Sequence, residues 1–100
     1  MKLFKDALIY DGTGAEAFMG DILVENDRIV QVGESIALED GWEIVGLEGL
    51  SVAPGFIDAH SHNDWFAIKK DTQKYFEPFI RQGITSFVTG NCGLSAVGFD

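Results

Sequence analysis

Two histidines separated by one residue, His60 and His62, are the clearest chemical signal in the sequence, and the chain contains no others. They follow a short apolar segment, so we expect a strand over residues 56–60. Side chains two positions apart in a strand project to the same side, which would place Asp58, His60 and His62 on one face. Two imidazoles at a strand end are well placed to hold one divalent metal ion.

The single cysteine, Cys92, is predicted to reach the same place. Residues 71–82 indicate a helix that ends at Gly83, and the β-branched residues within 84–89 indicate the next strand. This order predicts a βαβ unit with parallel strands and a right-handed crossover. Parallel strands share one C-terminal edge, where α/β folds place their active sites, so Cys92 would return to the edge that holds the histidines. Thiolate and imidazole are both good zinc ligands.

Each of these residues also has a plainer interpretation. A His-x-His pair alone fits a surface position as well as a metal site, and a lone cysteine is more often a small buried hydrophobe than a ligand. Asp58 is expected to orient a ligand or to organise a turn rather than to act as a catalytic base. Asp64 fits a solvated loop carboxylate or a substrate contact. Asn91, next to Cys92, is a further candidate for a supporting or substrate-contacting role.

The crossover between the two strands has several predicted features. Residues 63–70 indicate a polar and aromatic connection, and Asp71 or Thr72 can cap the helix that follows. Pro78 lies within this helix and predicts a kink or a later helix start. The aromatic residues of the crossover are expected to pack it against the sheet rather than to bind a cofactor; they are Trp65, Phe66, Tyr75, Phe76 and Phe79.

The chain before residue 54 consists of short strand-like segments separated by turns, which is typical of a small all-β unit. Strands are expected at 3–9 (with poor alternation), 21–25, 28–33, 42–47 and 50–53, with a hairpin turn at Asn26-Asp27 and an acidic loop at 35–41. We therefore predict two domains, one over residues 1–53 and an α/β part over residues 54–100.

Composition restricts the classes of function. Hydrophobic residues make up 46% of the chain, which indicates a globular protein rather than a disordered one. The net charge of −9 argues against a nucleic-acid partner, because such binding requires a basic surface. One cysteine cannot form an internal disulfide, and neither a signal peptide nor a membrane-spanning run is found. These features predict a cytoplasmic protein without a membrane partner.

Two segments resemble a known family. Residues 53–62, Ala-Pro-Gly-Phe-Ile-Asp-Ala-His-Ser-His, resemble the first-strand motif of the amidohydrolase superfamily, PGFID-x-H-x-H. Residues 82–93, Gln-Gly-Ile-Thr-Ser-Phe-Val-Thr-Gly-Asn-Cys-Gly, are similar to the QG-[IV]-T-x-x-V-x-GNCG stretch of the N-acyl-D-amino-acid deacylases, or D-aminoacylases. In relatives such as dihydropyrimidinases a carbamylated lysine on a later strand bridges the metals. A cysteine on the second strand therefore favours the deacylase branch.

This resemblance implies an α/β protein with an all-β N-terminal part, namely a partial β-sandwich followed by the first two strands and first helix of a (β/α)8 barrel. It implies zinc-dependent hydrolysis of the amide bond of N-acyl-D-amino acids, with one or two Zn(2+) ions. Cys92 would be a metal ligand, and His60 and His62 would line the adjacent metal position. The family's catalytic aspartate and two further histidines come from later strands, so the chain is expected to be an inactive N-terminal fragment.

Two other interpretations remain open. The chain could be a short, non-catalytic metal-binding or assembly module that self-associates through the unpaired edge of its parallel strands. It could instead belong to another amidohydrolase, acting on dipeptides or cyclic amides. The ending Gly98-Phe99-Asp100 carries no helix cap and favours truncation over the short module.

Overall fold

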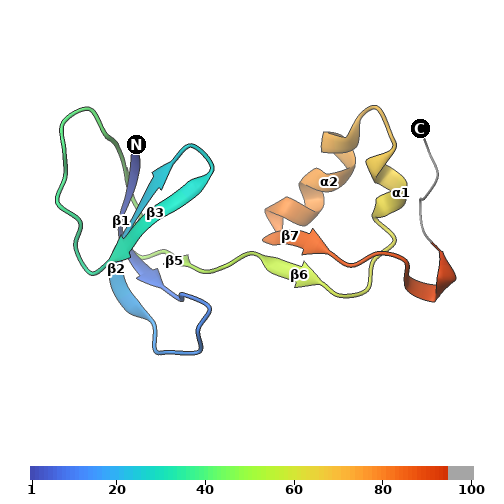
Figure 1. Ribbon diagram of the computed structural model, residues 1–100, viewed down its shortest axis with the longest axis horizontal. Coiled ribbons are helices and arrows are strands. Elements are labelled where there is room, and N and C mark those ends of the chain that lie inside the picture. Colours follow the sequence, from blue (N-terminus) through green and yellow to red (C-terminus); the bar gives the residue numbers. More distant parts are fainter. Residues whose placement is uncertain (95–100) are drawn as a thin grey trace. The chain divides into compact units, whose positions relative to one another are not determined.

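The computed structural model describes residues 1–94 (Figure 1). The chain divides into two compact units, Met1–Pro54 and Gly55–Asp100, which are described separately below. The ending Gly98-Phe99-Asp100, on which the expectation of truncation rested, lies outside the described residues. Among residues 1–94, no helix is long and apolar enough to cross a membrane.

The first unit is a five-stranded sheet, as the pattern of short strands predicts. β1 lies at its centre, antiparallel to β2 and parallel to both β4 and β5, while β3 pairs with β2. The predicted hairpin turn joins β2 to β3, where Asn26 has a φ of 54°, a left-handed conformation that asparagine tolerates. The strands are β1 (Lys2–Ile9), β2 (Phe18–Glu25), β3 (Arg28–Gly33), β4 (Glu43–Gly46) and β5 (Ser51–Val52).

A β-bulge explains the poor alternation of the first strand. The register between β1 and β2 shifts between Phe4 and Ala7, and Asp6 within the bulge has a φ of 61°. The extra residue moves the side chains after it to the other face, so Phe4 packs in the same apolar cluster as Ala7 and Ile9. A second cluster is formed by Leu3, Leu23 and Ile36, with Trp42 packed against it.

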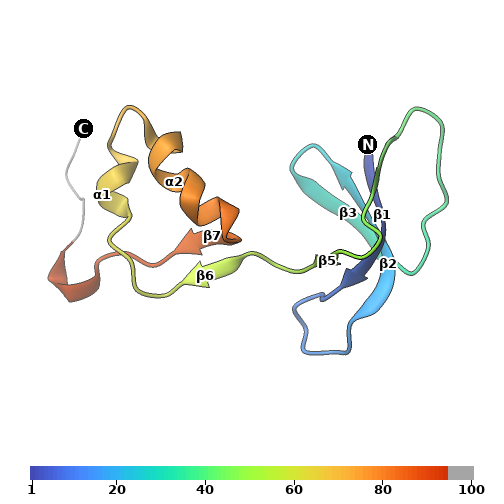
Figure 2. The same ribbon diagram turned by 180° about the vertical axis from the view of Figure 1, so that it is seen from behind.

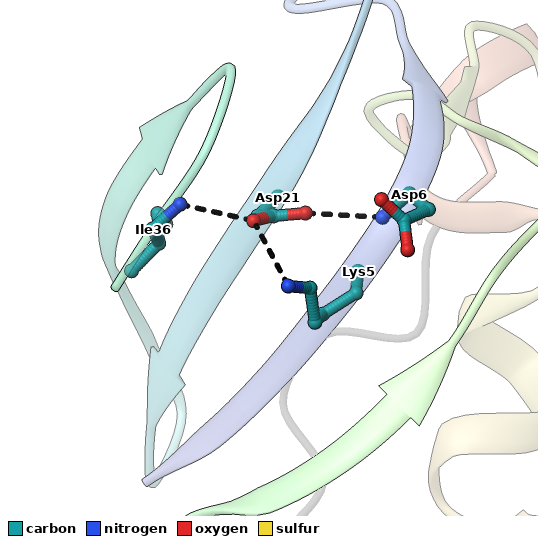
Figure 3. Close-up of polar contacts among 4 residues, drawn as sticks. All are labelled: Lys5, Asp6, Asp21 and Ile36. Carbon is teal, nitrogen blue, oxygen red and sulfur yellow. Dashed lines mark hydrogen bonds and ion pairs between the residues drawn. The ribbon is translucent and has the colours of Figure 1, made fainter. Parts of the chain in front are cut away.

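The carboxylate of Asp21, which is only 2% exposed, holds this bulge in place. Its Oδ1 accepts a hydrogen bond from the Asp6 N–H and its Oδ2 accepts one from the Ile36 N–H, both at 3.0 Å (Figure 3). The Lys5 Nζ lies 4.0 Å from Oδ2. Burial alone would raise the pKa of Asp21, but the two N–H donors and the Lys5 charge outweigh it and lower the pKa below its ordinary value of 3.8.

The second unit is the predicted strand–helix–strand arrangement with parallel strands. β6 (Phe56–Asp58) pairs with β7 (Ile84–Phe87), and α1 (Asp64–Ala67) and α2 (Thr72–Arg81) connect them. Both helices lie on the same side of the strand pair (Figures 1 and 2). A 3-10 turn, η1 (Asn91–Gly93), follows β7.

Two expectations for this unit are wrong. The strand predicted over residues 56–60 ends at Asp58, so His60 and His62 lie in the loop that follows rather than on one face of a strand. The stretch 63–70, expected to be a polar and aromatic connection without a helix, contains the single helical turn α1. The reason for the early strand end lies in local side-chain hydrogen bonds, which are described with the site below.

α2 begins at Thr72 and is continuous through Pro78, so the later helix start considered from the sequence is wrong. Asp71 stands at the N-cap position, but its side chain makes no capping hydrogen bond. Gly83 ends the helix with a φ of 82°, as a C′ glycine should. Packing on the sheet comes from Phe76, whose ring stacks on Phe87 with centroids 5.7 Å apart.

Candidate metal centre

The structure brings three potential metal donors together: His60, His62 and Cys92. One donor atom from each lies within 4.8 Å of the other two, and all three side chains reach solvent. The Cys92 Sγ lies 3.7 Å from the His60 Nε2. The two imidazole rings meet edge to face, with centroids 5.6 Å apart and planes at 80°. The histidines come from the loop after β6 and the thiol from the turn after β7, so the C-terminal ends of both strands contribute.

Short-range hydrogen bonds shape the loop that carries the histidines. The Asp58 Oδ1 accepts a hydrogen bond from the His60 N–H at 3.2 Å, and the Ser61 Oγ accepts one from the Asn63 N–H at 3.0 Å. Such bonds from short polar side chains compete with regular strand pairing, and β6 ends at Asp58. Ser61 and Asn63 are buried, at 6% and 7% exposed, while His60 is exposed and His62 is half-buried.

The turn that carries Cys92 contains three residues with positive φ. Gly90 has a φ of 76° and Gly93 one of 70°, which glycine adopts without strain, but Cys92 itself has a φ of 58°. That conformation is uncommon for a residue with a side chain, and such strain concentrates at functional sites. The turn reverses the chain directly after β7 and returns the thiol to the histidines.

Hydrogen bonds continue between the two segments past the ends of the strands. The Val88 N–H donates to the Asp58 carbonyl at 2.8 Å, and the Ser61 N–H donates to the Val88 carbonyl at 3.3 Å. The Asn91 side-chain Nδ2 donates to both the Ser61 and the Val88 carbonyl oxygens, at 3.2 and 2.9 Å. The two donor-bearing segments are therefore joined by backbone and side-chain bonds.

The donor set fits a thiolate- and imidazole-binding metal such as zinc. In a tetrahedral site, Zn–S and Zn–N bonds of about 2.3 and 2.0 Å place sulfur and nitrogen about 3.5 Å apart. The 3.7 Å between the Cys92 Sγ and the His60 Nε2 is close to that separation. The His62 Nδ1 is buried and has no hydrogen-bond partner among residues 1–94. A buried imidazole nitrogen without such a partner is available to bind a metal ion.

The remaining predicted site residues have different positions. The Asp58 carboxylate bonds to the His60 backbone and is not among the three converging donors. Asp64 lies in the first turn of α1, also outside that set. Sequence reasoning missed Ser61, which supplies both a carbonyl to Asn91 and a hydroxyl to the turn. Its position between two histidines, two residues before an asparagine, was the available signal for a hydroxyl-stabilised turn.

Comparisons with known proteins give a consistent result. No protein-family model matches the chain. It is 42% identical over 89 residues to the N-acyl-D-aspartate deacylase of Alcaligenes xylosoxydans xylosoxydans, covering 89% of this chain and 17% of that protein. It resembles the structure of a D-aminoacylase mutant in complex with copper chloride (TM-score 0.81, 35% identity, 98% of this chain and 20% of the other). It also resembles the N-acyl-D-glutamate deacylase of Bordetella bronchiseptica complexed with zinc and a phosphonate inhibitor (TM-score 0.75, 35% identity, 94% and 19%).

These relatives are amidohydrolases, the class of which a related D-aminoacylase structure is described as a subset. Within that class, the chain belongs to the N-acyl-D-amino-acid deacylase, or D-aminoacylase, family. It spans less than a fifth of the length of the first curated relative, since only 17% of that protein is covered.

Proposed function

We propose that this chain carries part of the metal centre of a zinc-dependent hydrolase that cleaves the amide bond of N-acyl-D-amino acids. One observation carries the proposal: the side chains of His60, His62 and Cys92 converge at the C-terminal ends of two parallel strands, within 4.8 Å. Family membership supports the reaction class, and the zinc bound to the related N-acyl-D-glutamate deacylase supports the choice of metal. A set of three donors is compatible with either one or two zinc ions.

In this proposal the residues of the chain have distinct tasks. The Cys92 thiolate and the two imidazoles hold the metal and must be deprotonated to do so. Asp58 fixes the His60 backbone, and Ser61 fixes the turn that separates the histidines. A bound zinc ion would polarise the amide carbonyl and lower the pKa of a water molecule. A reduced Cys92 is required throughout, which supports a cytoplasmic setting.

The substrate and the remaining catalytic groups belong to the proposal for the whole enzyme. Because the relatives are much longer, the general base, the further metal ligands and the groups that bind an N-acyl amino acid are expected outside residues 1–100. In the longer protein, we expect further strands and helices to extend β6 and β7 into a (β/α)8 barrel that carries these groups. The 100-residue chain alone is therefore expected to bind metal but not to hydrolyse N-acetyl-D-amino acids. Turnover above that of metal ions alone would contradict this expectation.

Metal binding by the chain tests the proposal directly. Since the chain has one cysteine and two histidines, each ligand can be removed singly, with Cys92→Ser, His60→Ala and His62→Ala. After equilibrium dialysis against zinc, we expect about one zinc ion bound per chain and its loss in Cys92→Ser, His60→Ala and His62→Ala. Glu39→Gln, at an exposed acid of the first unit, controls for adsorption by the acidic surface. Equal zinc content in wild type and Cys92→Ser would rule out the proposed ligand set.

A further inference from the structure

We propose that Asn91 is a positioning residue whose side-chain amide clamps the loop after β6 to the turn after β7, and so sets the separation between the His60 imidazole and the Cys92 thiol. This inference rests on the proposed function, because the separation matters only if these groups share a metal. Asn91 itself is not a metal donor here, since its Nδ2 is committed to two carbonyl oxygens.

The hydrogen bonds of Asn91 place it between the two donor segments. Its Nδ2 donates to the Ser61 carbonyl at 3.2 Å and to the Val88 carbonyl at 2.9 Å. Ser61 is the residue between the two histidines, and Val88 directly follows β7. A primary amide has two N–H donors, so these two bonds use its full donor capacity. One side chain thus connects the loop of the imidazoles to the strand end that precedes the thiol.

The backbone alone does not complete this connection. Past the strand ends, the Val88 N–H donates to the Asp58 carbonyl and the Ser61 N–H donates to the Val88 carbonyl. Neither of these backbone bonds uses the Ser61 carbonyl oxygen. Ser61 is only 6% exposed and the bond to its carbonyl is partly buried, so water can replace a lost protein partner only in part. Asn91 supplies that partner. Removing the donor would leave a partly buried acceptor without its protein partner at the point where the loop must be held.

Among residues 1–94, few hydrogen bonds other than those of Asn91 restrain the turn that carries Cys92. Gly90 before it and Gly93 after it both have positive φ, and Cys92 adopts a left-handed conformation despite its side chain. Within the turn, the Leu94 N–H donates to the Asn91 carbonyl at 3.0 Å. Both restraints act through Asn91, its side chain toward the loop and its carbonyl within the turn. The residue directly before the thiol therefore fixes where the turn begins.

The commitment of the amide also separates this role from substrate contact. With both N–H groups bonded, only the Oδ1 of Asn91 could reach a ligand, and as an acceptor it would not bind a substrate carboxylate. The geometry therefore favours positioning over substrate recognition for this residue.

The experiment compares Asn91→Asp with Gln82→Glu in the 100-residue chain. Asn91→Asp keeps the side-chain shape, removes both donors and directs a carboxylate at two carbonyl oxygens. Gln82→Glu makes the same chemical change at a matched position, since the Gln82 Nε2 donates to the Pro78 carbonyl at 2.9 Å at the end of α2. Cobalt(II) replaces zinc as the probe, because its thiolate charge-transfer and ligand-field absorption report ligation and geometry without any turnover.

We expect Asn91→Asp to bind cobalt about 10- to 100-fold more weakly than wild type, the range found when groups that orient metal ligands are lost. Its thiolate-to-cobalt band should also weaken at saturation. Gln82→Glu should behave like wild type. Amide hydrogen exchange without metal gives the second measurement: the Ser61 N–H should exchange faster in Asn91→Asp. The Phe56 N–H, which donates to the Gly83 carbonyl at 2.7 Å at the far end of the ladder, should stay protected and so show that the unit remains folded.

The outcomes separate this inference from the proposed function. If wild type and Asn91→Asp bind cobalt with equal affinity and equal spectra, the positioning role is wrong while the metal site stands. If wild type binds no cobalt, the proposed function fails. In that case, hydrogen exchange still tests whether the Asn91 side chain holds the loop after β6. Unchanged protection of the Ser61 amide in Asn91→Asp would overturn that role.

Discussion

Asp21 illustrates how one buried side chain can determine the path of two backbone segments. Its carboxylate accepts hydrogen bonds from the bulge at Asp6 and from the loop at Ile36 (Figure 3). Two acceptors on one side chain therefore satisfy two N–H groups that lie outside the strand ladders. The lowered pKa of Asp21 means that folding favours its ionised form, so its contribution to stability depends on pH.

The sign of that dependence gives a prediction. Because the pKa of Asp21 is lower in the folded state, its contribution is fully present above its ordinary value of 3.8 and is lost as the pH falls through the lowered value. An asparagine at this position would offer one acceptor where two are needed, so Asp21→Asn should reduce the free energy of unfolding at pH 7 by about 1–3 kcal/mol. Urea unfolding at pH 7 and pH 3 should show that this difference shrinks at pH 3. Asp40→Asn, at an exposed position, serves as the control. A difference that stays constant with pH would contradict the assignment.

At the scale of the elements, β6 and β7 approach so closely that one position accepts only glycine. A Cβ built on Gly55 would overlap the side chain of Thr85 in β7. The absence of a side chain at residue 55 thus permits the parallel pairing whose ends carry the proposed metal donors. The Pro-Gly pair before β6 therefore has a packing role as well as a turn role.

Gly55→Ala should weaken this pairing by about 1–3 kcal/mol, the usual cost of inserting a methyl group into a filled space. Thr85→Ala in the same chain should restore part of the loss, because it removes the nearest overlapping atoms. Gly33→Ala, where nothing lies within 4 Å, should have little effect. Hydrogen exchange of the Phe56 N–H measures the opening of the strand pair. Equal protection in wild type and Gly55→Ala would disprove the close approach.

The order of the strands and helices could be predicted from the sequence, but the residues at which they end could not. The apolar runs, the Asn26 turn and Gly83 predict the strands and α2, because periodicity and backbone preference act locally. The three-residue length of β6 depends instead on the Asp58 carboxylate and the Ser61 hydroxyl, which capture nearby N–H groups. Residue type alone does not reveal whether such a side chain bonds its own backbone or faces solvent. The convergence of His60 and Cys92 was deduced from the parallel topology, whereas the positive φ of Cys92 was not foreseeable.

At the scale of the whole molecule, the second unit leaves much apolar surface uncovered. Phe56, Ile57 and Ile80 are 65%, 69% and 65% exposed, and α1 and α2 lie on the same side of the two strands (Figure 2). Parallel sheets are normally covered on both faces and paired at their edges. In the much longer relatives, additional chain is available for that purpose; in the 100-residue chain, a second copy is the available partner.

We therefore expect the 100-residue chain to self-associate as its concentration rises. Sedimentation velocity should detect dimers or larger species, and Ile57→Lys should shift the population toward monomer, because a lysine on an edge strand opposes pairing. Gln73→Lys, which adds the same single positive charge on exposed α2, controls for altered net charge. A single monomeric species at all concentrations would argue against association.

The proposed metal donors have one further consequence, which concerns the unfolded chain. His60 and Cys92 are 32 positions apart, so a shared metal ion would close a loop of that length. A covalent cross-link over such a loop removes about 3–4 kcal/mol of chain entropy from the unfolded state. None of the residues of α1 or α2 is buried, so the second unit has little apolar burial of its own to offset the ordering of its chain. The ion would then act as a tether as well as a catalytic ion, so the stability of this unit would rise with metal supply while that of the five-stranded sheet, with its own core, would not.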